Sequence, residues 1–506
     1  MPTAKQTRQA NRIERNAPAP AIAHRAPGGS RVPAWSSARP EGARADASAP
    51  GRGHGPIART AQGIALCLVF GSAMAACAAP QDAGAQRTDA SQTGSNPALP
   101  APRAPRPIPT INIAPAVGWR AAEKPEAAPG LAVNAYAEGL QHPRWLYVLP
   151  NGDVLVAETN APPKPAETGL RAWFMKKVMG RAGAGVPSAN RISLLRDADG
   201  DGVAETRRIL LAGLHSPFGM ALAGGRLYVA NADAIVSVAW RSPRNGMAAI
   251  AEAPRKLTDL PGGPRNHHWT KSLLASGDGR RLYVGVGSNS NAAENGMQEE
   301  AWRADILEID TASGRKRVFA SGLRNPVGMA WEPATAALWT VVNERDELGD
   351  QLVPDYLTSV REAAFYGWPY SYYGQHVDAR VRPQRPDLVA RAIAPDYALG
   401  SYVAPLGLAF AKGARLPGYA EGAFVGLHGS WNRREPAGYK VVFVPFANGK
   451  PQGQPVDVLT GFLDGRGNAR GRPAGVAIGG DGALLVADDV GNRVWRVTAL
   501  RTPGSR

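Results

Sequence analysis

Two adjacent histidines in the stretch NHHWTK, residues 266–271, are the first candidates for acid–base chemistry. They stand before a run whose Val and Leu residues and Gly–Asp turn predict two strands. A histidine near its ordinary pKa accepts a proton at neutral pH, so His268 is a candidate general base. The alternative is a structural histidine that is hydrogen-bonded at the start of a strand.

Arginines at two other strand starts provide positive charge. Arg324 stands next to Asn325, and Arg470 precedes Arg472 by two residues, which places both on one side of an extended segment. A guanidinium group binds a carboxylate through a bidentate fork. These residues therefore predict a site for a small polyanion, whereas pairing with surface acids is the alternative.

The loop at residues 343–350, NERDELGD, is dense in carboxylates. Asp346, Glu347 and Asp350 offer the hard oxygen ligands that Ca²⁺ prefers, and a solvated acidic turn is the alternative. The run DADGDG at residues 197–202 begins like a calcium loop, but Arg208 stands where an EF-hand requires Glu. We interpret this second run as a turn between strands.

Aromatic side chains accompany polar ones in two further stretches, FYGWPY at residues 365–370 and HGSWNR at residues 428–433. Flat rings such as those of Tyr366, Trp368 and Trp431 can stack on a sugar or on a planar cofactor. Packing within the protein core is the alternative for each of them.

A recurring sequence motif shows how these residues are positioned. It reads Pro, aromatic or small residue, Gly and an apolar residue, then a turn, then Leu, an apolar residue, Val and Ala or Gly. Repeated strand–turn–strand units of about 60 residues indicate a β-propeller, and six copies predict an all-β, six-bladed propeller over residues 130–499. The candidate residues stand at unit starts, where a central site is expected. The six copies begin at His142, Ser216, His267, Asn325, Ala404 and Arg472.

The first 130 residues have a different composition. Residues 1–63 form a basic stretch without apolar periodicity, which predicts disorder. Residues 64–77 are apolar and end at Cys77, which predicts a secretory signal, with lipidation of Cys77 or plain cleavage as alternatives. Residues 78–129 are rich in Ala and Pro and predict an extended spacer. The expected location is the periplasm, with a lipid anchor as one form.

Cysteine content and charge limit the function classes. The only cysteines are Cys67 and Cys77, so the predicted propeller has no disulfide, thiol nucleophile or thiolate metal site. The formal net charge is +16, but no basic motif interleaved with aromatic residues is present. We therefore expect no nucleic-acid partner.

Six stretches in chain order carry a family signal: GLHSPFGMAL, NHHWTKSLLASGDGRRLYVGVGSN, ASGLRNPVGMAW, VNERDELGD, FYGWPY and HGSWNRREPAGYKVV. Together they resemble the sugar dehydrogenases that depend on pyrroloquinoline quinone (PQQ), most closely the sorbosone dehydrogenase branch. The resemblance implies a six-bladed propeller with PQQ and Ca²⁺ on its axis. It also implies that a histidine takes the proton of the sugar's C1 hydroxyl while a hydride passes to the quinone.

The resemblance assigns roles by position. His268 matches the base, and the loop from residue 344 to 350 matches the calcium loop. The sugar is expected against the aromatic stretch, and electrons are expected to leave to a cytochrome or a membrane quinone. Residues assigned to the cofactor are Arg324, Asn325, Arg470, Arg472, His215 and Trp431, and those assigned to the substrate are Tyr366 and Trp368.

The chain also departs from the soluble glucose dehydrogenase pattern. His267 stands where the family has an Asp, and Ser288 or Asn289 stands where it has a second acid. The cofactor-contacting Lys of the family has no clear match. Two other function classes stay open: a Ca²⁺-dependent lactonase on a similar propeller, and a non-catalytic propeller that binds glycans or proteins at the cell envelope.

Overall fold

The computed structural model describes residues 90–103, 110–164, 177, 179–241, 250 and 252–500, all within one unit of the chain, Cys77–Arg506. The predicted disordered leader (residues 1–63), signal segment (residues 64–77) and lipidation site (Cys77) lie outside the described residues. Within the described ranges, no helix has the length and apolar composition of a membrane span.

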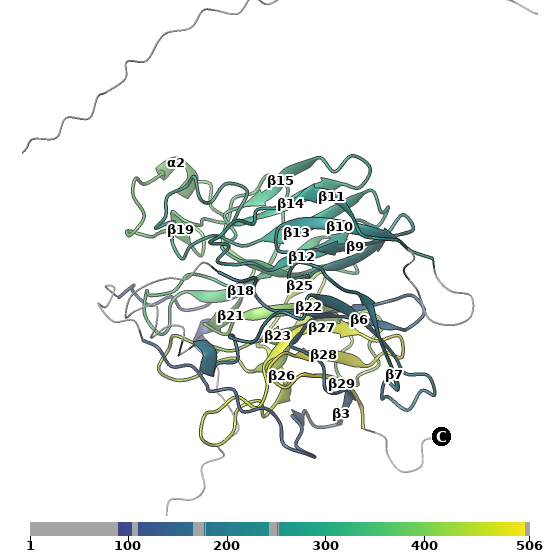
Figure 1. Cartoon of the computed structure of the whole chain (residues 1–506). Coiled ribbons are helices and arrows are strands. Elements are labelled where there is room, and N and C mark those ends of the chain that lie inside the picture. The colour runs from purple at the N-terminus through teal and green to yellow at the C-terminus, as the bar shows by residue number, and fades with distance from the viewer. Residues whose placement is uncertain are drawn as a thin grey trace, which may run out of the picture. The chain divides into compact units, whose positions relative to one another are not determined.

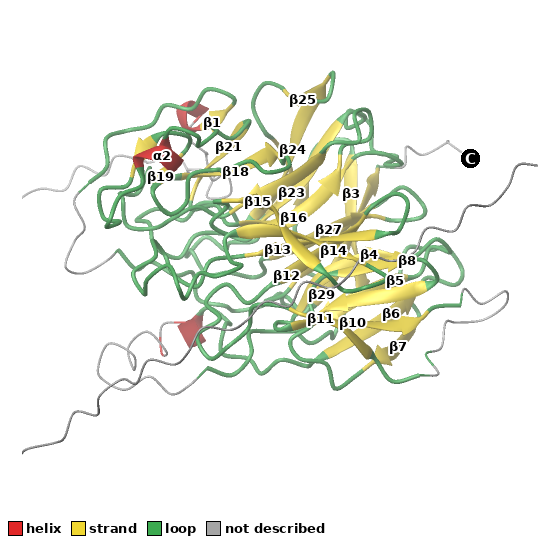
Figure 2. Ribbon diagram, turned by 90° about the horizontal axis from the view of Figure 1, so that it is seen from above, coloured by secondary structure: helices red, strands yellow, loops and turns green. Residues whose placement is uncertain are grey.

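Six antiparallel sheets form the blades of a propeller, which confirms the predicted all-β, six-bladed fold (Figures 1 and 2). In each blade the first strand of the repeat lies at the centre and the following strands lie progressively outward, while β1 (Thr93–Gly94), β2 (Glu126–Ala127) and β3 (Leu131–Ala137), which precede the first repeat, are added at the outer edges of blades 4, 5 and 6. Blade 1 contains β4 (Pro143–Val148), β5 (Val154–Glu158), β6 (Arg191–Arg196) and β7 (Thr206–Leu211). Blade 2 contains β8 (Met220–Ala223), β9 (Arg226–Ala230), β10 (Ala234–Ala239) and β11 (Arg255–Asp259). Blade 3 contains β12 (Lys271–Ala275), β13 (Arg281–Val286), β14 (Asp305–Asp310) and β15 (Lys316–Ser321).

The remaining blades carry additional short elements. Blade 4 contains β16 (Pro326–Trp331), β17 (Leu338–Val342), β18 (Pro354–Ser359), β21 (Tyr397–Ser401) and β1 (Thr93–Gly94). Blade 5 contains β22 (Pro405–Phe410), β23 (Gly422–Leu427), β24 (Lys440–Ala447), β26 (Val456–Thr460), β2 (Glu126–Ala127) and, paired with β24, β25 (Lys450–Pro451). Blade 6 contains β27 (Pro473–Ile478), β28 (Leu484–Asp488), β29 (Arg493–Ala499) and β3 (Leu131–Ala137). Outside the blades lie η1 (Ala90–Gln92), the hairpin of β19 (Ser371–Tyr372) and β20 (His376–Val377), and α2 (Pro386–Val389).

The glycine of the recurring sequence motif permits close packing between blades. At Gly219 a Cβ would lie 2.3 Å from the backbone nitrogen of Leu273, which belongs to the inner strand of the next blade. The equivalent glycines of three other copies meet the next inner strand in the same way, because a side chain there would overlap backbone atoms. These glycines are Gly328, Gly407 and Gly475.

We expect Gly407→Ala to destabilise the propeller. The added Cβ would lie 2.5 Å from the Ala474 carbonyl oxygen, so blades 5 and 6 must separate. The expected loss in unfolding free energy is about 1–3 kcal/mol, the usual cost of overpacking. Chemical denaturation measures it, and Gly465→Ala is the matched control because a Cβ at Gly465 meets nothing within 4 Å. Equal stability of the two variants would contradict this account of the repeat.

The residue after the proline position of the motif lies in an apolar cluster that the inner strands share. Five blades supply buried apolar side chains to this cluster: Phe218, Trp269, Val327, Leu406 and Ala474. In blade 1 the corresponding residue is Arg144, whose guanidinium lies 5.9 Å from the ring centroid of Trp269. The centre of the propeller is therefore filled by side chains, with one arginine among them.

The ring is closed by a strand that precedes the first repeat. The strand β3 pairs with β29, so residues before the first repeat complete the blade formed by the last one. The adjoining residues 90–103 and 110–129 differ from the predicted spacer, because they also pack on the blades. Trp119 contacts the rings of Phe462 and Trp495, and Ala114 is buried. An Ala- and Pro-rich segment suits this role, since small side chains let its backbone lie close to the blades.

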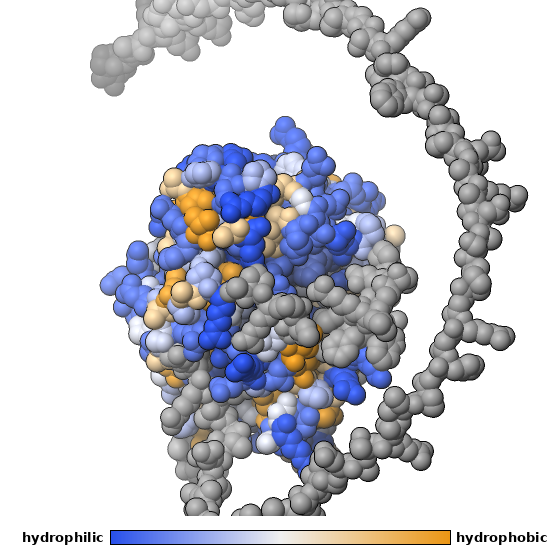
Figure 3. Space-filling view, turned by 90° about the vertical axis from the view of Figure 1, so that its left-hand side faces the viewer, coloured by the Kyte–Doolittle hydropathy of each residue, from blue (hydrophilic) through white to orange (hydrophobic). Residues whose placement is uncertain are grey.

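Exposed large apolar side chains are scattered over the described surface, with Val117, Ile209 and Val377 as examples. The face shown in Figure 3 is mainly hydrophilic, with separate small apolar areas. Single exposed apolar residues are normal for a protein surface.

Candidate functional site

The predicted site residues gather at one end of the propeller. Neighbouring strands in each blade are antiparallel, so the loop before each first strand and the loop after each second strand lie at the same end. The first kind of loop carries His215, His268, Arg324, Asn325, Arg470 and Arg472. The second kind carries Trp431 and the acidic loop at residues 343–350. We call this end the axial face.

His268 has the hydrogen-bonding pattern of a general base. Its Nδ1 lies 2.8 Å from the carbonyl oxygen of Ser288, so Nδ1–H donates and Nε2 keeps its lone pair. The Ser288 hydroxyl lies 3.1 Å from the same nitrogen. Burial, together with His267 and Arg324, holds the pKa of His268 well below its ordinary value. The imidazole is therefore neutral at pH 7 and able to accept a proton at Nε2.

Lys271 supports this loop and was missed in the sequence. It is fully buried, and its Nζ donates to the Trp269 carbonyl at 3.0 Å and to the His268 carbonyl at 3.4 Å. Burial lowers the pKa of Lys271 well below its ordinary value. The available signal was its place in the repeat, because other copies have Met, Leu or Val there.

Arg324 connects three loops: its own loop before β16, the loop after β13 and the acidic loop after β17. Its Nε and Nη2 donate to the carbonyl and side-chain oxygens of Asn291, at 3.1 and 3.0 Å. Its Nη1 donates to the Glu344 carbonyl at 2.6 Å, and Nη2 also reaches Asp346 Oδ2 at 3.1 Å. Because its N–H groups point at acceptors of the chain itself, Arg324 acts on the site by positioning these loops, and the cofactor contact assigned to it stays a prediction.

Two other assigned residues, Arg472 and Asn325, are buried without full partners. Arg472 is 4% exposed, stacks 4.7 Å above the ring of Tyr439 and reaches two carbonyls only at 3.3 and 3.4 Å. No described carboxylate forms an ion pair with it. The side-chain oxygen of Asn325 is also buried, without a hydrogen-bond partner among the described residues. These atoms fit a ligand that brings carboxylate and donor groups.

The other assigned residues are more exposed. Arg470 lies 3.8 Å from Glu123 of the N-terminal segment. His215 pairs with Asp233 at 2.9 Å beside a cavity of about 240 Å³ that Lys164 also lines. The ring of Trp431 is partly exposed, and its carbonyl accepts the backbone N–H of Asn112.

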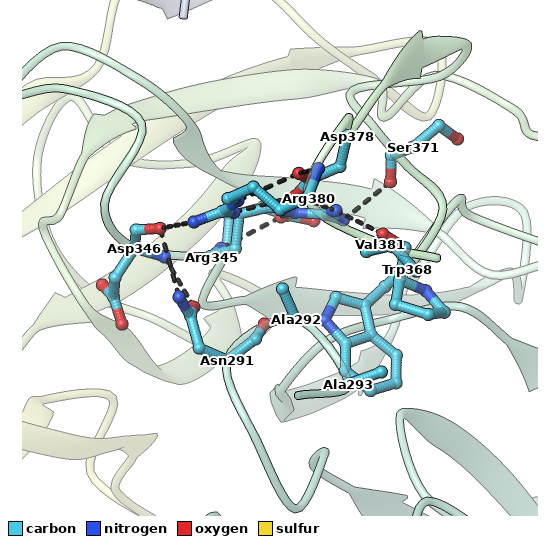
Figure 4. Close-up of polar contacts among 12 residues, drawn as sticks. Asn291, Ala292, Ala293, Arg345, Asp346, Trp368, Ser371, Asp378, Arg380 and Val381 are labelled. Atoms are coloured by element: carbon cyan, nitrogen blue, oxygen red, sulfur yellow. Dashed lines mark hydrogen bonds and ion pairs between the residues drawn. The ribbon is translucent and has the colours of Figure 1, made fainter. Parts of the chain in front are cut away.

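The carboxylates of the acidic loop do not converge on one point. Asp346 is bound by Arg324 and by the side-chain amide of Asn432 at 2.8 Å, and Figure 4 shows it beside Asn291. Glu347 is exposed, and Asp350 lies 3.9 Å from Arg434. The predicted trio Asp346, Glu347 and Asp350 therefore does not form a metal site from side chains alone.

Within the described ranges, the acids that lie close enough together to share an ion are in the turn between β6 and β7, at the opposite end of blade 1. They are Asp197, Asp199, Asp201 and Glu205. The sequence interpretation of this run as a turn between strands agrees with its place in blade 1.

The aromatic assignments Tyr366 and Trp368 require correction. Tyr366 is 1% exposed and its hydroxyl donates to the Ser359 carbonyl at 2.6 Å. Trp368 is 2% exposed and its Nε1–H donates to the Asn291 carbonyl at 2.9 Å. Both rings are core residues that anchor the segment after β18. Asp378 and Arg380 of this segment form an ionic network with Arg345 of the acidic loop (Figure 4). Neither ring is available to stack on a substrate.

A buried cluster around Asp489 was also missed. Its carboxylate accepts from Arg144 at 2.7 Å and from His428 Nε2 at 2.8 Å, and His142 Nε2 lies 3.8 Å away. Burial alone would raise the pKa of Asp489, but His428, His142 and Arg144 hold it well below its ordinary value. Arg144 links this ionised cluster to Trp269, the residue after His268. The four members come from three segments that are far apart in the sequence, residues 142–144, His428 and Asp489, so only the fold brings them together.

Comparisons with known proteins show what this chain is similar to. The family model described as Glucose / Sorbosone dehydrogenase matches residues 231–430, and a TrAA12-like model matches residues 384–499. A PQQ-dependent pyranose dehydrogenase of Coprinopsis cinerea is 26% identical over 323 residues, which span 50% of this chain and 43% of that protein. The aldose sugar dehydrogenase YliI of Escherichia coli is 23% identical over 322 residues, 59% of this chain and 79% of that protein.

A solved structure shares the fold. The PQQ domain of the Coprinopsis cinerea pyranose dehydrogenase superposes with a TM-score of 0.60 at 21% identity, covering 76% of this chain and 100% of that domain. The alignment with the full-length fungal enzyme spans less than half of its length. Sequence motifs, the family model and these relatives together show that part of this chain is similar to the PQQ-dependent sugar dehydrogenases, and the solved structure shows the shared six-bladed fold.

Proposed function

We propose that this protein is a quinoprotein that oxidises an aldose or an aldehyde sugar of the sorbosone or glucose kind. The observation that carries the proposal is Arg472, a buried guanidinium without an ion-pair partner among the described residues, on the same axial face as His268. A redox cofactor that carries carboxylates supplies the missing negative charge. A lactonase would need no such group.

The residues fit PQQ at its acidic edge. Arg472 would hold one of its carboxylates, and the Asn325 side chain would turn its free oxygen toward a donor on the ligand. Arg324 would keep the loops around Asn291 and Glu344 in place. When bound, PQQ supplies the acceptor for the hydride that leaves the sugar.

The proton is the task of His268. Its Nδ1–H is held by Ser288, so Nε2 would accept the proton of the sugar's C1 hydroxyl. For an aldehyde sugar, the hydrated form offers the same hydroxyl. Lys271 fixes the carbonyls of this loop and therefore the direction of the ring.

Three further parts of the proposal concern Ca²⁺, the cellular location and the electron acceptor, and they do not rest on the geometry of the site. Because the carboxylates of the acidic loop are turned to different partners, we assign no step to Ca²⁺ and treat it as a variable of the test. The apolar segment before Cys77 supports a periplasmic protein, anchored by lipid or free. A cytochrome c or a membrane quinone would take the electrons.

A reconstitution titration tests the proposal. We expect the purified protein to bind PQQ tightly, as followed by absorbance, and then to reduce a dye when an aldose or sorbosone is added. The titration is run with Ca²⁺ and with a chelator. Absence of PQQ binding under every metal condition would overturn the proposal, and hydrolysis of lactones or binding of glycans without turnover would then identify the function.

A further inference from the structure

A cavity on the axial face lies beside the segment that leads to His268. Its volume is about 240 Å³, and its walls are loops of blades 1, 2 and 3. We call it the lateral cavity; it is lined by residues 162–164, His215, Asp233 and residues 262–266. Pockets for drug-sized ligands usually measure roughly 300–1,000 Å³, so this smaller cavity suits a single sugar ring.

One wall of the lateral cavity is held in place by a buried arginine. Arg303 is 5% exposed, and its Nη2 donates to the Gly262 carbonyl at 2.6 Å and to the side-chain oxygen of Asn266 at 3.1 Å. Gly262 also packs closely on Asp233, because a Cβ on this glycine would lie 2.8 Å from the Asp233 Cβ. The cavity is therefore preformed by hydrogen bonds and close packing, as ligand pockets usually are.

Positive side chains are in excess around the lateral cavity. Lys164 and Arg265 face a single carboxylate, Asp233, and that carboxylate already pairs with His215 at 2.9 Å. Arg265 donates from Nη1 to the side-chain oxygen of Asn295 at 2.9 Å, and none of the described carboxylates forms an ion pair with it. Its guanidinium therefore keeps N–H donors for a ligand, and a carboxylate is the group that this planar fork binds best.

The lateral cavity and the base share one rigid segment. Asn266 lines the cavity and stands two residues before His268. Its side-chain oxygen also accepts a hydrogen bond from Lys271 at 3.4 Å, and Lys271 donates to the His268 carbonyl as well. Burial lowers the pKa of His268 most, and the charge of Lys164 is among the other causes, so this cation acts at the base. A sugar with C1 at His268 can therefore extend toward Lys164.

We propose that the lateral cavity binds the carboxylate of a hexuronate, so that this protein oxidises acidic sugars in preference to neutral ones. The proposal rests on the proposed function and names its substrate class. The cavity belongs to blades 1–3, whereas Arg324, Asn325 and Arg472, assigned to PQQ, belong to blades 4 and 6. The bond changes at C1 stay the same. The C1–H bond breaks as a hydride leaves to PQQ, the hydroxyl proton passes to His268, and the product is a lactone that keeps its carboxylate.

Steady-state dye reduction by the PQQ-loaded protein tests the proposal with matched sugar pairs. Glucuronate is compared with glucose, and galacturonate with galactose, because the members of each pair differ only at C6. We expect kcat/KM to be higher for the uronate of at least one pair by about tenfold, the value of one charge-assisted hydrogen bond. The KM of the uronate should also rise with salt concentration, while that of the neutral sugar should not.

Substitutions in the cavity separate binding from chemistry. Arg265→Gln and Lys164→Gln should each raise the KM for the uronate by about tenfold, with kcat and the constants for the neutral sugar little changed. Arg280→Gln is the matched control, because Arg280 is an exposed arginine in the turn between β12 and β13, at the opposite end of blade 3. Both cavity residues are exposed, so the variants should fold.

Each outcome decides for or against the cavity. Equal kcat/KM within both pairs, or equal effects of the variants on acidic and neutral sugars, would overturn the proposal. If the protein binds no PQQ, the proposed function fails, and calorimetry with glucuronate and the PQQ-free protein tests the cavity alone. Binding that weakens in Arg265→Gln and Lys164→Gln, and not in Arg280→Gln, would then support the carboxylate site. Binding that is absent or insensitive to these variants would overturn it.

Discussion

Replacing His268 by alanine is expected to lower turnover by about two orders of magnitude or more while PQQ remains bound. The variant loses Nε2, the ring nitrogen that would accept the hydroxyl proton in the proposed function, because Nδ1 is held by Ser288. The residues assigned to the cofactor are untouched, since none of them hydrogen-bonds to the imidazole. Steady-state dye reduction gives kcat, and absorbance gives the bound PQQ.

The pH profile separates a base from a structural residue. Burial, His267 and Arg324 hold the pKa of His268 well below its ordinary value of about 6.5, so the reactive neutral form persists below that pH. The wild-type rate should stay level as the pH falls through about 6.5 and decline only in more acidic solution. Full activity of His268→Ala, or a rate that falls together with PQQ occupancy, would show that the base assignment is wrong. His376→Ala serves as the control histidine.

Replacing Asp489 by alanine should lower the free energy of unfolding by about 3–5 kcal/mol, the cost of breaking a buried ion pair by removing one partner. The carboxylate is 2% exposed and accepts from both Arg144 and His428. Without it, the guanidinium of Arg144 keeps a buried charge at the centre of the propeller. Chemical denaturation followed by tryptophan fluorescence measures the change.

The matched control for this variant is Asp481→Ala. Asp481 also pairs with an arginine, Arg496, but its carboxylate side chain is 46% exposed, so its loss should cost less than about 1 kcal/mol. If both variants lose the same small amount of stability, the buried cluster does not hold the axial residues together.

The ring of blades and the positions of its central residues could both be predicted from the sequence, because the recurring motif includes the strands of each blade and the residues at its axial end. Its glycine sets the approach of adjacent inner strands, and its first residues face the axial end. His268 and Arg472 were therefore found from their place in the repeat. Contacts between repeats carry no such pattern, which is why the partners of Asp489 were missed.

The wrong or incomplete predictions have physical reasons. Tyr366 and Trp368 look like stacking surfaces in sequence, but the segment after β18 folds back and buries them. Asp346 looks like a metal ligand in the sequence. In the structure its carboxylate accepts a hydrogen bond from Arg324, which lies in the preceding loop of the same blade. The Ala- and Pro-rich segment looked like a spacer because of its composition, and the packing of Trp119 and Ala114 on the blades becomes visible only in the fold.

The pairing of β3 with β29 imposes an order on the assembly of this protein during synthesis. Residues 131–137 leave the ribosome roughly 350 residues before their partner, residues 493–499, so β3 waits for the strand β29 of the last repeat. Pairing between such distant segments is slow, and edges that wait unpaired invite association with other chains. A nascent chain that stalls before residue 493 would therefore present both an unpaired strand and an open blade, and the emergence of residues 493–499 is the event that allows the ring to close.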